Sequence, residues 1–416
     1  MKRRTTVAAI DVGSTKVAVI VGDMGEQGET RILGVGVAPA AGLSRGVIDN
    51  IQSAREAIGI AVEKAEQACG MRILSAVVGI SGGHISSQNN RGIIAIPDRS
   101  KSISEDDRNR VLESAGQVAI PTNRQVIHVV PRGFWIEGTE PVTDPVGMYG
   151  GRLDSEVHIV SGAVSAIQNL TKCVEGAGVQ VDDIVLECIA SATSVLQEQE
   201  RQQGVALVDI GGSTTSIAVY DEGSVAHTAC LPIAGSQLTN DLARVLRCPW
   251  EAAEQLKVGV GAAYADPTTH ELVEIQAFGT QSKKSIHLKH VCEILQARSE
   301  EILEMVAVEL KRVGYYDRLA AGLVLTGGTS QLKGLAEVAE ERLGIPARIG
   351  KPAHYSGLSD LIGTPAFATS IGLVEYALGA RERVTEPAGN SGPSFEVPVG
   401  GFFRRIASLG RALMPE

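Results

Sequence analysis

The chain has 416 residues, which is too long for one hydrophobic core and predicts two or more domains. Its net charge of −10 argues against nucleic-acid binding, because a phosphate backbone requires a basic protein face. The six cysteines form no C-x-x-C pair and apolar runs stay short, so we expect no zinc site, no disulfide framework and no membrane-spanning helix.

A β-hairpin over residues 7–20 is the first element that the sequence predicts. Its first apolar run ends in a carboxylate, and a short turn of small and polar residues leads into the second run. The turn comprises Asp11, Gly13, Ser14, Thr15 and Lys16. Glycines let backbone N–H groups approach an anion closely and hydroxyl groups add donors, which favours phosphate binding. An ordinary hairpin turn without a ligand is the alternative.

Regular α/β structure continues to residue 83 and then changes character. A strand, a helix and a second strand are predicted over 31–38, 49–69 and 74–80. From residue 84 to 162 short strands surround one helix starting at Ser104, which predicts a small inserted α+β subdomain. The alternative is a long decoration on the edge of the first domain. The short strands are predicted at 92–96, 126–130, 134–136 and 157–161.

The chain then repeats its first hairpin. Helices are predicted at 163–177 and 191–200, with a strand at 184–186. A second hairpin follows at 205–220, and a carboxylate again precedes its turn. This turn comprises Asp209, Gly211, Gly212, Ser213 and Thr214. The repeat predicts two like-folded halves that each offer one phosphate loop. Because an aspartate repels phosphate, its natural partner in such a loop is hydrated Mg²⁺.

A third glycine loop occurs near the end of the folded region. Helices predicted at 235–245, 249–257 and 291–312 lead to a strand at 323–325. That strand ends in T-G-G-T, in which Gly327, Gly328 and Thr329 would let a flat or anionic group pack against the backbone at a helix start. Further helices are predicted at 334–343 and 370–378.

The C-terminal segment has two parts. Residues 381–398 are polar and contain several Pro, Gly and Ser residues, which is typical of a flexible linker. Residues 399–416 place apolar residues along one helical face with arginines beside them, which predicts a helix lying in a membrane interface. Docking on the protein's own body or on a partner helix is the alternative. The expected membrane residues are Phe402, Phe403, Arg404, Arg405, Ile406, Leu409, Arg411 and Leu413.

The ordered motifs D-V-G-S-T-K, D-I-G-G-S-T-T and T-G-G-T resemble those of the actin, heat-shock chaperone and sugar-kinase ATPase superfamily. Within it the chain resembles the FtsA family of bacterial actin-like cell division proteins. The insertion starting G-H-I-S-S, the turn G-M-Y-G-G-R-L and the tail carry this resemblance, which spans essentially the whole chain. It implies an α/β, actin-like two-domain ATPase fold with an inserted α+β subdomain and a C-terminal amphipathic helix on a flexible linker.

The resemblance also implies how the chain divides into subdomains. The first core subdomain would comprise 1–83, 163–200 and 360–380, the insert 84–162, and the second core subdomain 201–235 and 316–359. The outer subdomain would comprise 236–315, followed by the linker at 381–398 and the amphipathic helix at 399–416.

An ATP and Mg²⁺ site follows from the same resemblance. The two hairpin turns would hold the phosphates, Asp11 and Asp209 would face Mg²⁺ through water, and the third loop would pack on the adenosine. Glu187 matches an acidic residue that orients the attacking water, although Cys188 stands where the family more often has proline. With Asp209, Glu187 is a candidate catalytic residue, but we expect slow turnover at best because no further cation is evident.

Glu254 and Lys257 match the segment that touches the nucleoside in this superfamily. An ordinary Glu–Lys pair on a helix surface is the alternative interpretation of these two residues.

The resemblance implies several partners. The outer subdomain would bind the C-terminal peptide of FtsZ over residues 283–298, with Glu293 and Arg298 as candidates. The insert would recruit later divisome membrane proteins, copies of the chain would form a filament, and the tail would bind lipids on the cytoplasmic side of the inner membrane at the septum. The alternatives are a small-molecule kinase, for which no convincing substrate-side base is evident, and a pilus-assembly actin-like protein, which should lack the tail.

Overall fold

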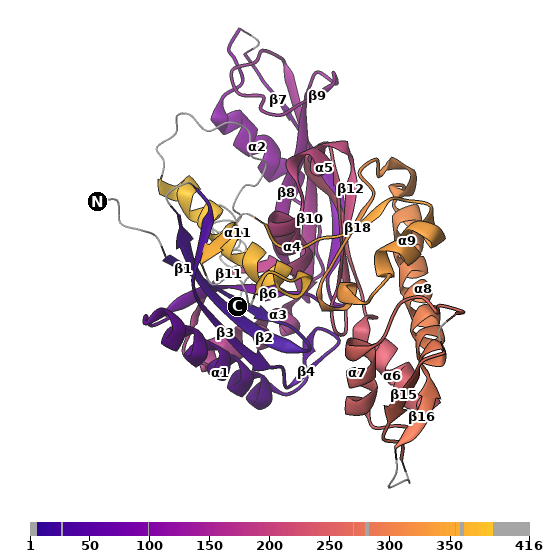
Figure 1. Ribbon diagram of the computed structural model, residues 1–416. Helices are drawn as coiled ribbons and strands as arrows, with labels where there is room; N and C mark the ends of the chain where they lie inside the picture. The colour runs from indigo at the N-terminus through magenta and orange to yellow at the C-terminus, as the bar shows by residue number, and fades with distance from the viewer. Residues whose placement is uncertain are drawn as a thin grey trace.

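The computed structural model describes residues 6–25, 28–98, 100–268, 270–278, 283–353, 355–357 and 362–385. Two α/β halves lie side by side, a β-rich subdomain projects from them, and a smaller subdomain extends beyond the second half (Figure 1). The predicted tail at 399–416, with all its expected membrane residues, lies outside the described residues. In the described part of the chain, no helix has the length and apolar content needed to cross a bilayer.

The first half is built on a six-stranded sheet in the order β11-β6-β1-β2-β3-β19. Its strands are β1 (Thr6–Val12), β2 (Lys16–Met24), β3 (Thr30–Pro39), β6 (Ser75–Ile80), β11 (Gln180–Leu186) and β19 (Tyr355–Gly357). Successive β1 side chains point to opposite faces, so Ile10 packs toward helices α1 (Ile51–Cys69) and α3 (Val164–Gly176), whereas Ala9 packs toward α11 (Ala368–Thr385). A two-stranded ribbon, β4 (Leu43–Ser44) with β5 (Val47–Ile48), precedes α1.

The second half repeats this topology. An antiparallel meander of three strands is extended by two parallel strands beyond its first member, in the order β14-β13-β12-β17-β18. These strands are β12 (Val205–Ile210), β13 (Thr215–Asp221), β14 (Ser224–Leu231), β17 (Leu323–Thr326) and β18 (Ala347–Ile349). Helices α8 (Leu288–Arg312) and α9 (Leu335–Leu343) cover one face. The prediction of two like-folded halves is therefore confirmed, although β14 and β18 were not predicted.

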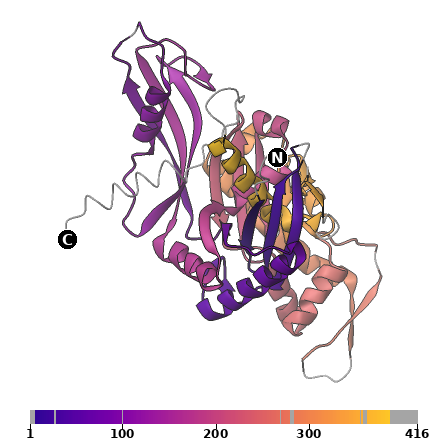
Figure 2. The same cartoon turned by 90° about the vertical axis from the view of Figure 1, so that its left-hand side faces the viewer.

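The inserted subdomain is a four-stranded antiparallel sheet with helix α2 (Glu105–Gly116) packed on it (Figure 2). Its strands are β7 (Ser86–Ala95), β8 (Arg124–Ile136), β9 (Pro141–Val142) and β10 (Arg152–Ala163). The prediction of separate strands at 126–130 and 134–136 is wrong, because β8 runs through both. The strand register shifts between Glu156 and Val157, so the backbone of Arg132 has no residue opposite it in β10. This irregularity accommodates Pro131, which has no N–H to donate.

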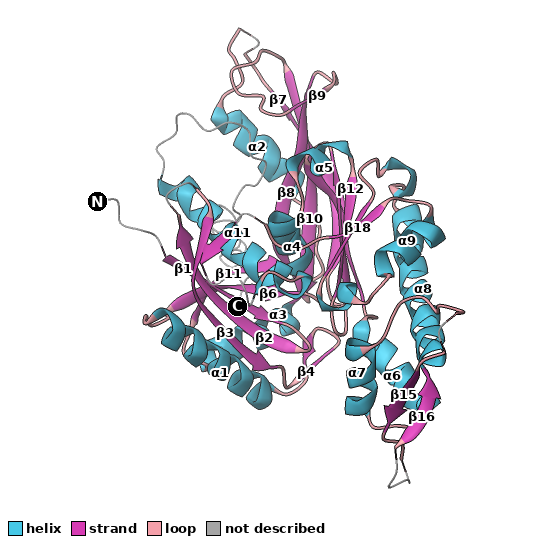
Figure 3. Ribbon diagram, in the orientation of Figure 1, coloured by secondary structure: helices cyan, strands magenta, loops and turns pink. Residues whose placement is uncertain are grey.

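The subdomain beyond the second half consists of two helices and a hairpin packed against α8 (Figure 3). Its elements are α6 (Gly235–Leu246), α7 (Trp250–Gly259), β15 (Leu272–Ile275) and β16 (Lys284–His287). The β15–β16 hairpin was not predicted, and α8 begins three residues before the predicted start at 291.

Two helices connect the halves, and both differ from their predicted bounds. The helix predicted at 191–200 is instead α4 (Glu187–Val195) followed by α5 (Glu198–Gln203). The backbone N–H of Gln197 donates to Glu200 Oε2 at 2.8 Å, a capping bond that starts a new helix.

The predicted linker also begins too early, because α11 continues to Thr385. Its last turns contain Ala, Arg and Glu, which favour helix without tertiary contacts.

Helix α11 crosses α4 at Gly372, and this crossing gives the first testable prediction. A Cβ at Gly372 would collide with the carbonyl oxygen of Ala190. We expect Gly372→Ala to lower the free energy of unfolding by about 1–3 kcal/mol, because the two helices must separate. The measurement is urea unfolding followed by circular dichroism.

Gly59 in α1 provides the matched control, since a Cβ there meets no atom within 4 Å. Gly59→Ala should raise stability by about 0.5–1 kcal/mol through the smaller entropy of the unfolded chain. Equal stability changes of the same sign in both variants would contradict the close helix crossing.

Candidate functional site

Two buried aspartates stand at corresponding positions of the two halves. Asp11 lies near the end of β1 and Asp209 near the end of β12. Asp11 Oδ2 accepts a hydrogen bond of 2.7 Å from Ser370 Oγ. Asp209 Oδ2 accepts bonds from Ser191 Oγ at 2.6 Å and from Thr369 Oγ1 at 3.1 Å. Because the donors Thr369 and Ser370 are consecutive residues, the two carboxylates face one junction between the halves.

The electrostatics of this junction are dominated by negative groups. Burial raises the pKa of both Asp11 and Asp209, and nearby Lys16 partly opposes this shift. Burial raises the pKa of Glu187 well above its usual range, and the charge of Asp11 adds to the effect. Burial lowers the pKa of Lys16, while the three carboxylates act against that change. The charges of these three acidic groups act on one lysine, but within the described residues no group of three or more His, Cys, Asp or Glu side chains is placed to hold a metal ion directly.

The two predicted phosphate turns lie against each other. A Cβ at Gly212 would collide with Thr15 Oγ1 and would lie 3.0 Å from Ser14 Oγ. Within the turns, a Cβ would lie 3.0 Å from the carbonyl oxygen of Lys16 at Gly13 and 3.2 Å from that of Thr214 at Gly211. Ser213 occupies the second turn and is partly buried. The structure thus brings both turns together, and a side chain at Gly212 would fill the space between them.

The third glycine loop joins the same junction. Gly327 has a φ of 85°, a conformation that favours glycine, and a Cβ there would collide with Asp209 Oδ1. Thr329 Oγ1 donates to the carbonyl oxygen of Gly211 at 2.7 Å. Gly328 is more open, since its nearest neighbour would be Ala366 Cβ at 3.8 Å. All three predicted loops therefore converge on Asp209 and its turn.

A pocket of about 640 Å³ opens beside the third loop, and Lys257, Gly328 and Thr329 help to line it. Lys257 Nζ lies 2.7 Å from Glu254 Oε2 and donates to Thr239 Oγ1 at 2.9 Å. Only 12% of the Lys257 side chain is exposed. Lys257 therefore ties α7 to the start of α6 and also lines the pocket.

Lys16 reaches across to the segment that precedes α11. Its Nζ donates to the carbonyl oxygen of Ala366 and lies 4.1 Å from the centre of the Phe367 ring. This cation–π contact and the bond to backbone hold the Lys16 side chain beside the first phosphate turn. Sequence analysis did not single out Phe367, because the contact joins residues about 350 positions apart.

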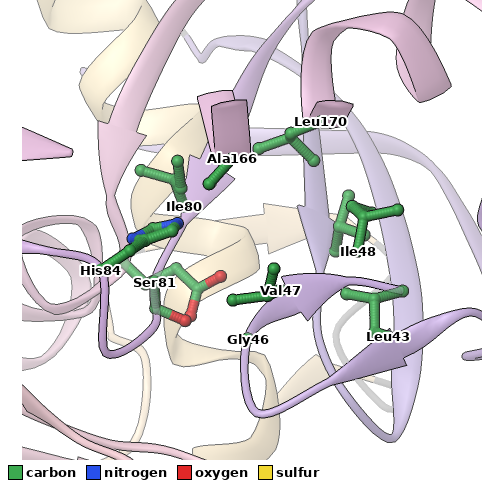
Figure 4. Close-up of a pocket in the computed structure, with 12 residues that line it drawn as sticks. Leu43, Gly46, Val47, Ile48, Ile80, Ser81, His84, Ala166 and Leu170 are labelled. Atoms are coloured by element: carbon green, nitrogen blue, oxygen red, sulfur yellow. The ribbon is translucent and has the colours of Figure 1, made fainter. Parts of the chain in front are cut away.

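Glu187 also lines a small cavity, and Figure 4 shows other residues that surround it. Its volume of about 20 Å³ suits one water molecule and excludes a larger ligand. Ser81 and His84 line it together with apolar residues of β5 and α3, and His84 Nδ1 is buried with no hydrogen-bond partner within the described residues. Burial lowers the pKa of His84 and the nearby Arg124 adds to the effect.

The two predicted partner residues lie on α8, in the outer subdomain. Arg298 Nε donates to Asp241 Oδ2 of α6 at 2.5 Å, and a second guanidinium nitrogen pairs with Glu301. Glu293 lies 3.4 Å from His290 Nδ1 and half of its side chain is exposed. Arg298 is thus engaged within the protein, whereas Glu293 is accessible.

The prediction missed the hydroxyl groups that bind the aspartates. Ser191, Thr369 and Ser370 are all buried, on α4 and α11. Polar residues within otherwise apolar helices were a weak signal, because a buried polar side chain normally has a hydrogen-bond partner. The identity of those partners depends on how the helices cross, which spacing alone does not give.

Comparison with known proteins places the chain within a family. The family model described as Cell division protein FtsA matches residues 206–372, and the model of the SHS2 domain inserted in FtsA matches 82–161. The Cell division protein FtsA of Pseudomonas aeruginosa is 43% identical over 373 residues, covering 89% of each chain.

Solved structures show the fold. The PilM–PilN type IV pilus biogenesis complex contains a chain with a TM-score of 0.63 and 14% identity, covering 90% of this chain and 99% of that chain. MreB5 of Spiroplasma citri bound to ADP gives a TM-score of 0.55 and 13% identity, covering 91% and 98%. At these identities the likeness concerns the fold alone, which is the actin-like fold predicted for the described residues.

The buried His128 of the insert yields a pH prediction for this region. His128 Nε2 accepts a hydrogen bond from the backbone N–H of Leu186 at 2.9 Å, next to Glu187. Burial lowers its pKa from 6.5 to about 4. The unfolded chain therefore binds an extra proton below pH 6.5, and stability present above that pH is lost as the pH falls toward 4.

We expect the difference in free energy of unfolding between the wild type and His128→Gln to fall by about 1.4 kcal/mol for each unit by which the pH is lowered across this window. Urea unfolding at several pH values from 7 to 4 measures it. The same replacement at the exposed His270 is the control. A matching pH dependence of the two variants would contradict a neutral, buried His128.

Proposed function

The chain belongs to the FtsA family of cell division proteins, and we propose that it is an ATP- and Mg²⁺-binding polymer that anchors FtsZ filaments to the membrane. The observation that carries the nucleotide part is the convergence of three glycine loops on two buried aspartates. The membrane part rests on the amphipathic pattern of residues 399–416.

The residues at the junction fit a magnesium–nucleotide complex. Gly212 lets the two turns approach each other closely, so that backbone N–H groups of both turns can face the same phosphates. Asp11 and Asp209 supply carboxylate oxygens, the donors that Mg²⁺ prefers, and Lys16 supplies a cation for phosphate. The pocket beside Gly328 lies next to the turns, where a nucleoside would follow its phosphates.

Bound Mg²⁺ would supply positive charge that neutralises the phosphates and the surrounding carboxylates. Asp11 and Asp209 would hold its water ligands, and Glu187 would orient the attacking water if hydrolysis occurs. We propose slow turnover at best. Lys16 is the cation that the described residues bring to Asp11, Asp209 and Glu187, and it contacts Ala366 and Phe367. A second cation that would stabilise transition-state charge is not found among these contacts.

Membrane attachment would use the tail as a reversible anchor. Five large apolar side chains contribute at most roughly 7–15 kcal/mol if fully buried, and ordering the tail removes much of this. Three arginines near anionic lipid add about 1 kcal/mol each, whereas the acidic body opposes binding. A polymer holding several tails together would bind far more firmly than one copy, which links filament formation to membrane attachment.

The finer partners belong to the same proposal. The FtsZ C-terminal peptide would bind the outer subdomain near Glu293 on α8, and later divisome proteins would bind the insert, at the cytoplasmic face of the inner membrane. The 43% identity to a cell division protein favours this role over a pilus-assembly role, because the pilus protein shares the fold at 14% identity. No feature of the described residues favours a small-molecule kinase.

The nucleotide site predicts the effect of added side chains in the loops. Gly212→Asp should weaken ATP binding at least tenfold, because the new side chain would collide with Thr15, push the two turns apart and repel phosphate. Gly328→Asp should act similarly beside the nucleoside pocket. Isothermal titration calorimetry with ATP and Mg²⁺ measures both, with Gly59→Ala as a control. Undiminished affinity in both aspartate variants would show that the cleft is elsewhere.

The anchor predicts the result of truncation. The full chain should sediment with liposomes that contain anionic lipid, and a chain ending at Pro398 should stay in solution, with or without ATP. Within the full chain, Leu409→Glu should release the protein because it charges the apolar face, whereas Ser408→Glu should have a smaller effect. Equal sedimentation of the truncated and full chains would contradict the anchor.

A further inference from the structure

The first turn of α11 binds both halves of the molecule at once. Thr369 Oγ1 donates to Asp209 Oδ2 of the second half at 3.1 Å, and Ser370 Oγ donates to Asp11 Oδ2 of the first half at 2.7 Å. Both donors are buried. Two consecutive residues of one helix therefore hold the carboxylates of two different sheets, and any change in the spacing of the sheets must act on these bonds.

The bonds also set the orientation of each carboxylate. In both aspartates the helix hydroxyls bind Oδ2, while Oδ1 turns toward a glycine loop. Asp11 Oδ1 lies 3.8 Å from the position of a Cβ at Gly13, and Asp209 Oδ1 lies against Gly327. The hydroxyls thus bind one oxygen of each carboxylate and leave the other facing a glycine loop of the predicted nucleotide site.

Helix α4 reinforces the second of these carboxylates. Ser191 Oγ donates to Asp209 Oδ2 at 2.6 Å and lies 2.9 Å from Thr369 Oγ1, so hydroxyls of both helices gather at one carboxylate oxygen. Ser194 Oγ, one turn later, lies 2.8 Å from the carbonyl oxygen of Ala368 and 3.1 Å from that of Ser191, and among the described residues these backbone atoms are its partners. Ser194 therefore joins α4 to α11 without touching either aspartate, and it offers a matched comparison.

We propose that Thr369 and Ser370 are positioning residues that orient Asp209 and Asp11 toward Mg²⁺ and thereby make nucleotide binding dependent on the metal. This inference rests on the nucleotide site proposed above. Hydroxyl donors that orient metal-facing carboxylates typically change metal affinity 10- to 100-fold when removed. Since the same helix continues to Thr385, the chain segment leading to the tail begins on the element that the metal site would restrain.

The test measures ATP affinity by isothermal titration calorimetry, in EDTA and over a series of Mg²⁺ concentrations. Thr369→Val and Ser370→Ala should each raise the Mg²⁺ concentration for the half-maximal gain in ATP affinity about tenfold, while affinity in EDTA stays within about twofold. Thr369→Ser keeps the hydroxyl and should restore the wild-type midpoint. Ser194→Ala should leave the midpoint unchanged.

A loss of ATP affinity that is equal with and without Mg²⁺ would overturn the inference, because it indicates general damage to the hinge, the helix pair α4 and α11 that connects the halves. An unchanged midpoint in Thr369→Val and Ser370→Ala, with a Mg²⁺ response in the wild type, would overturn it while leaving the proposed nucleotide site intact. A wild type that binds no ATP, or binds it equally without Mg²⁺, would overturn the nucleotide proposal itself. Hydrogen exchange of α4 and α11 without nucleotide shows whether each variant retains the helix pair.

Discussion

Two carboxylates buried at one junction impose the main constraint on this structure. Burial raises the pKa of Asp11 and of Asp209, because each carboxylate loses its hydration and apolar neighbours in a sheet core do not replace it. Hydroxyl donors from two helices bind the carboxylates, and one lysine places a positive charge near them. The halves are therefore held together by polar groups that are satisfied only when the sheets and both helices stand in the observed arrangement.

The helix pair that supplies these donors also forms the mechanical connection between the halves. The chain passes from β11 into α4 beside Glu187 and returns through α11, and Gly372 lets the two helices approach backbone to backbone. Close packing of this kind transmits small displacements, because it leaves no compressible space between the helices. A ligand that draws the two aspartates together would act on the hinge directly, without an intermediate element.

The inserted and outer subdomains both contact the second half, but at different elements. The insert contacts the second half through polar bonds, including Ser87 Oγ to the carbonyl oxygen of Thr228 at 2.7 Å and His158 Nε2 to Thr228 Oγ1 at 3.0 Å. The outer subdomain is tied in at α6, where the backbone N–H of Ser236 donates to the carbonyl oxygen of Gly212 at 2.6 Å. The insert is thus joined to β14 of the second half, whereas the outer subdomain is joined to the second phosphate turn.

The sequence by itself determined the repeated hairpins, the three glycine loops and the two-half architecture, because each depends on local turn chemistry or on apolar periodicity. It also identified Asp11, Asp209 and Glu187, which the structure brings to one junction. Only the tertiary structure decided which groups bind them. Ser191, Thr369 and Ser370 acquire their partners through a helix crossing, and bonds between residues up to 359 positions apart leave no trace in local spacing.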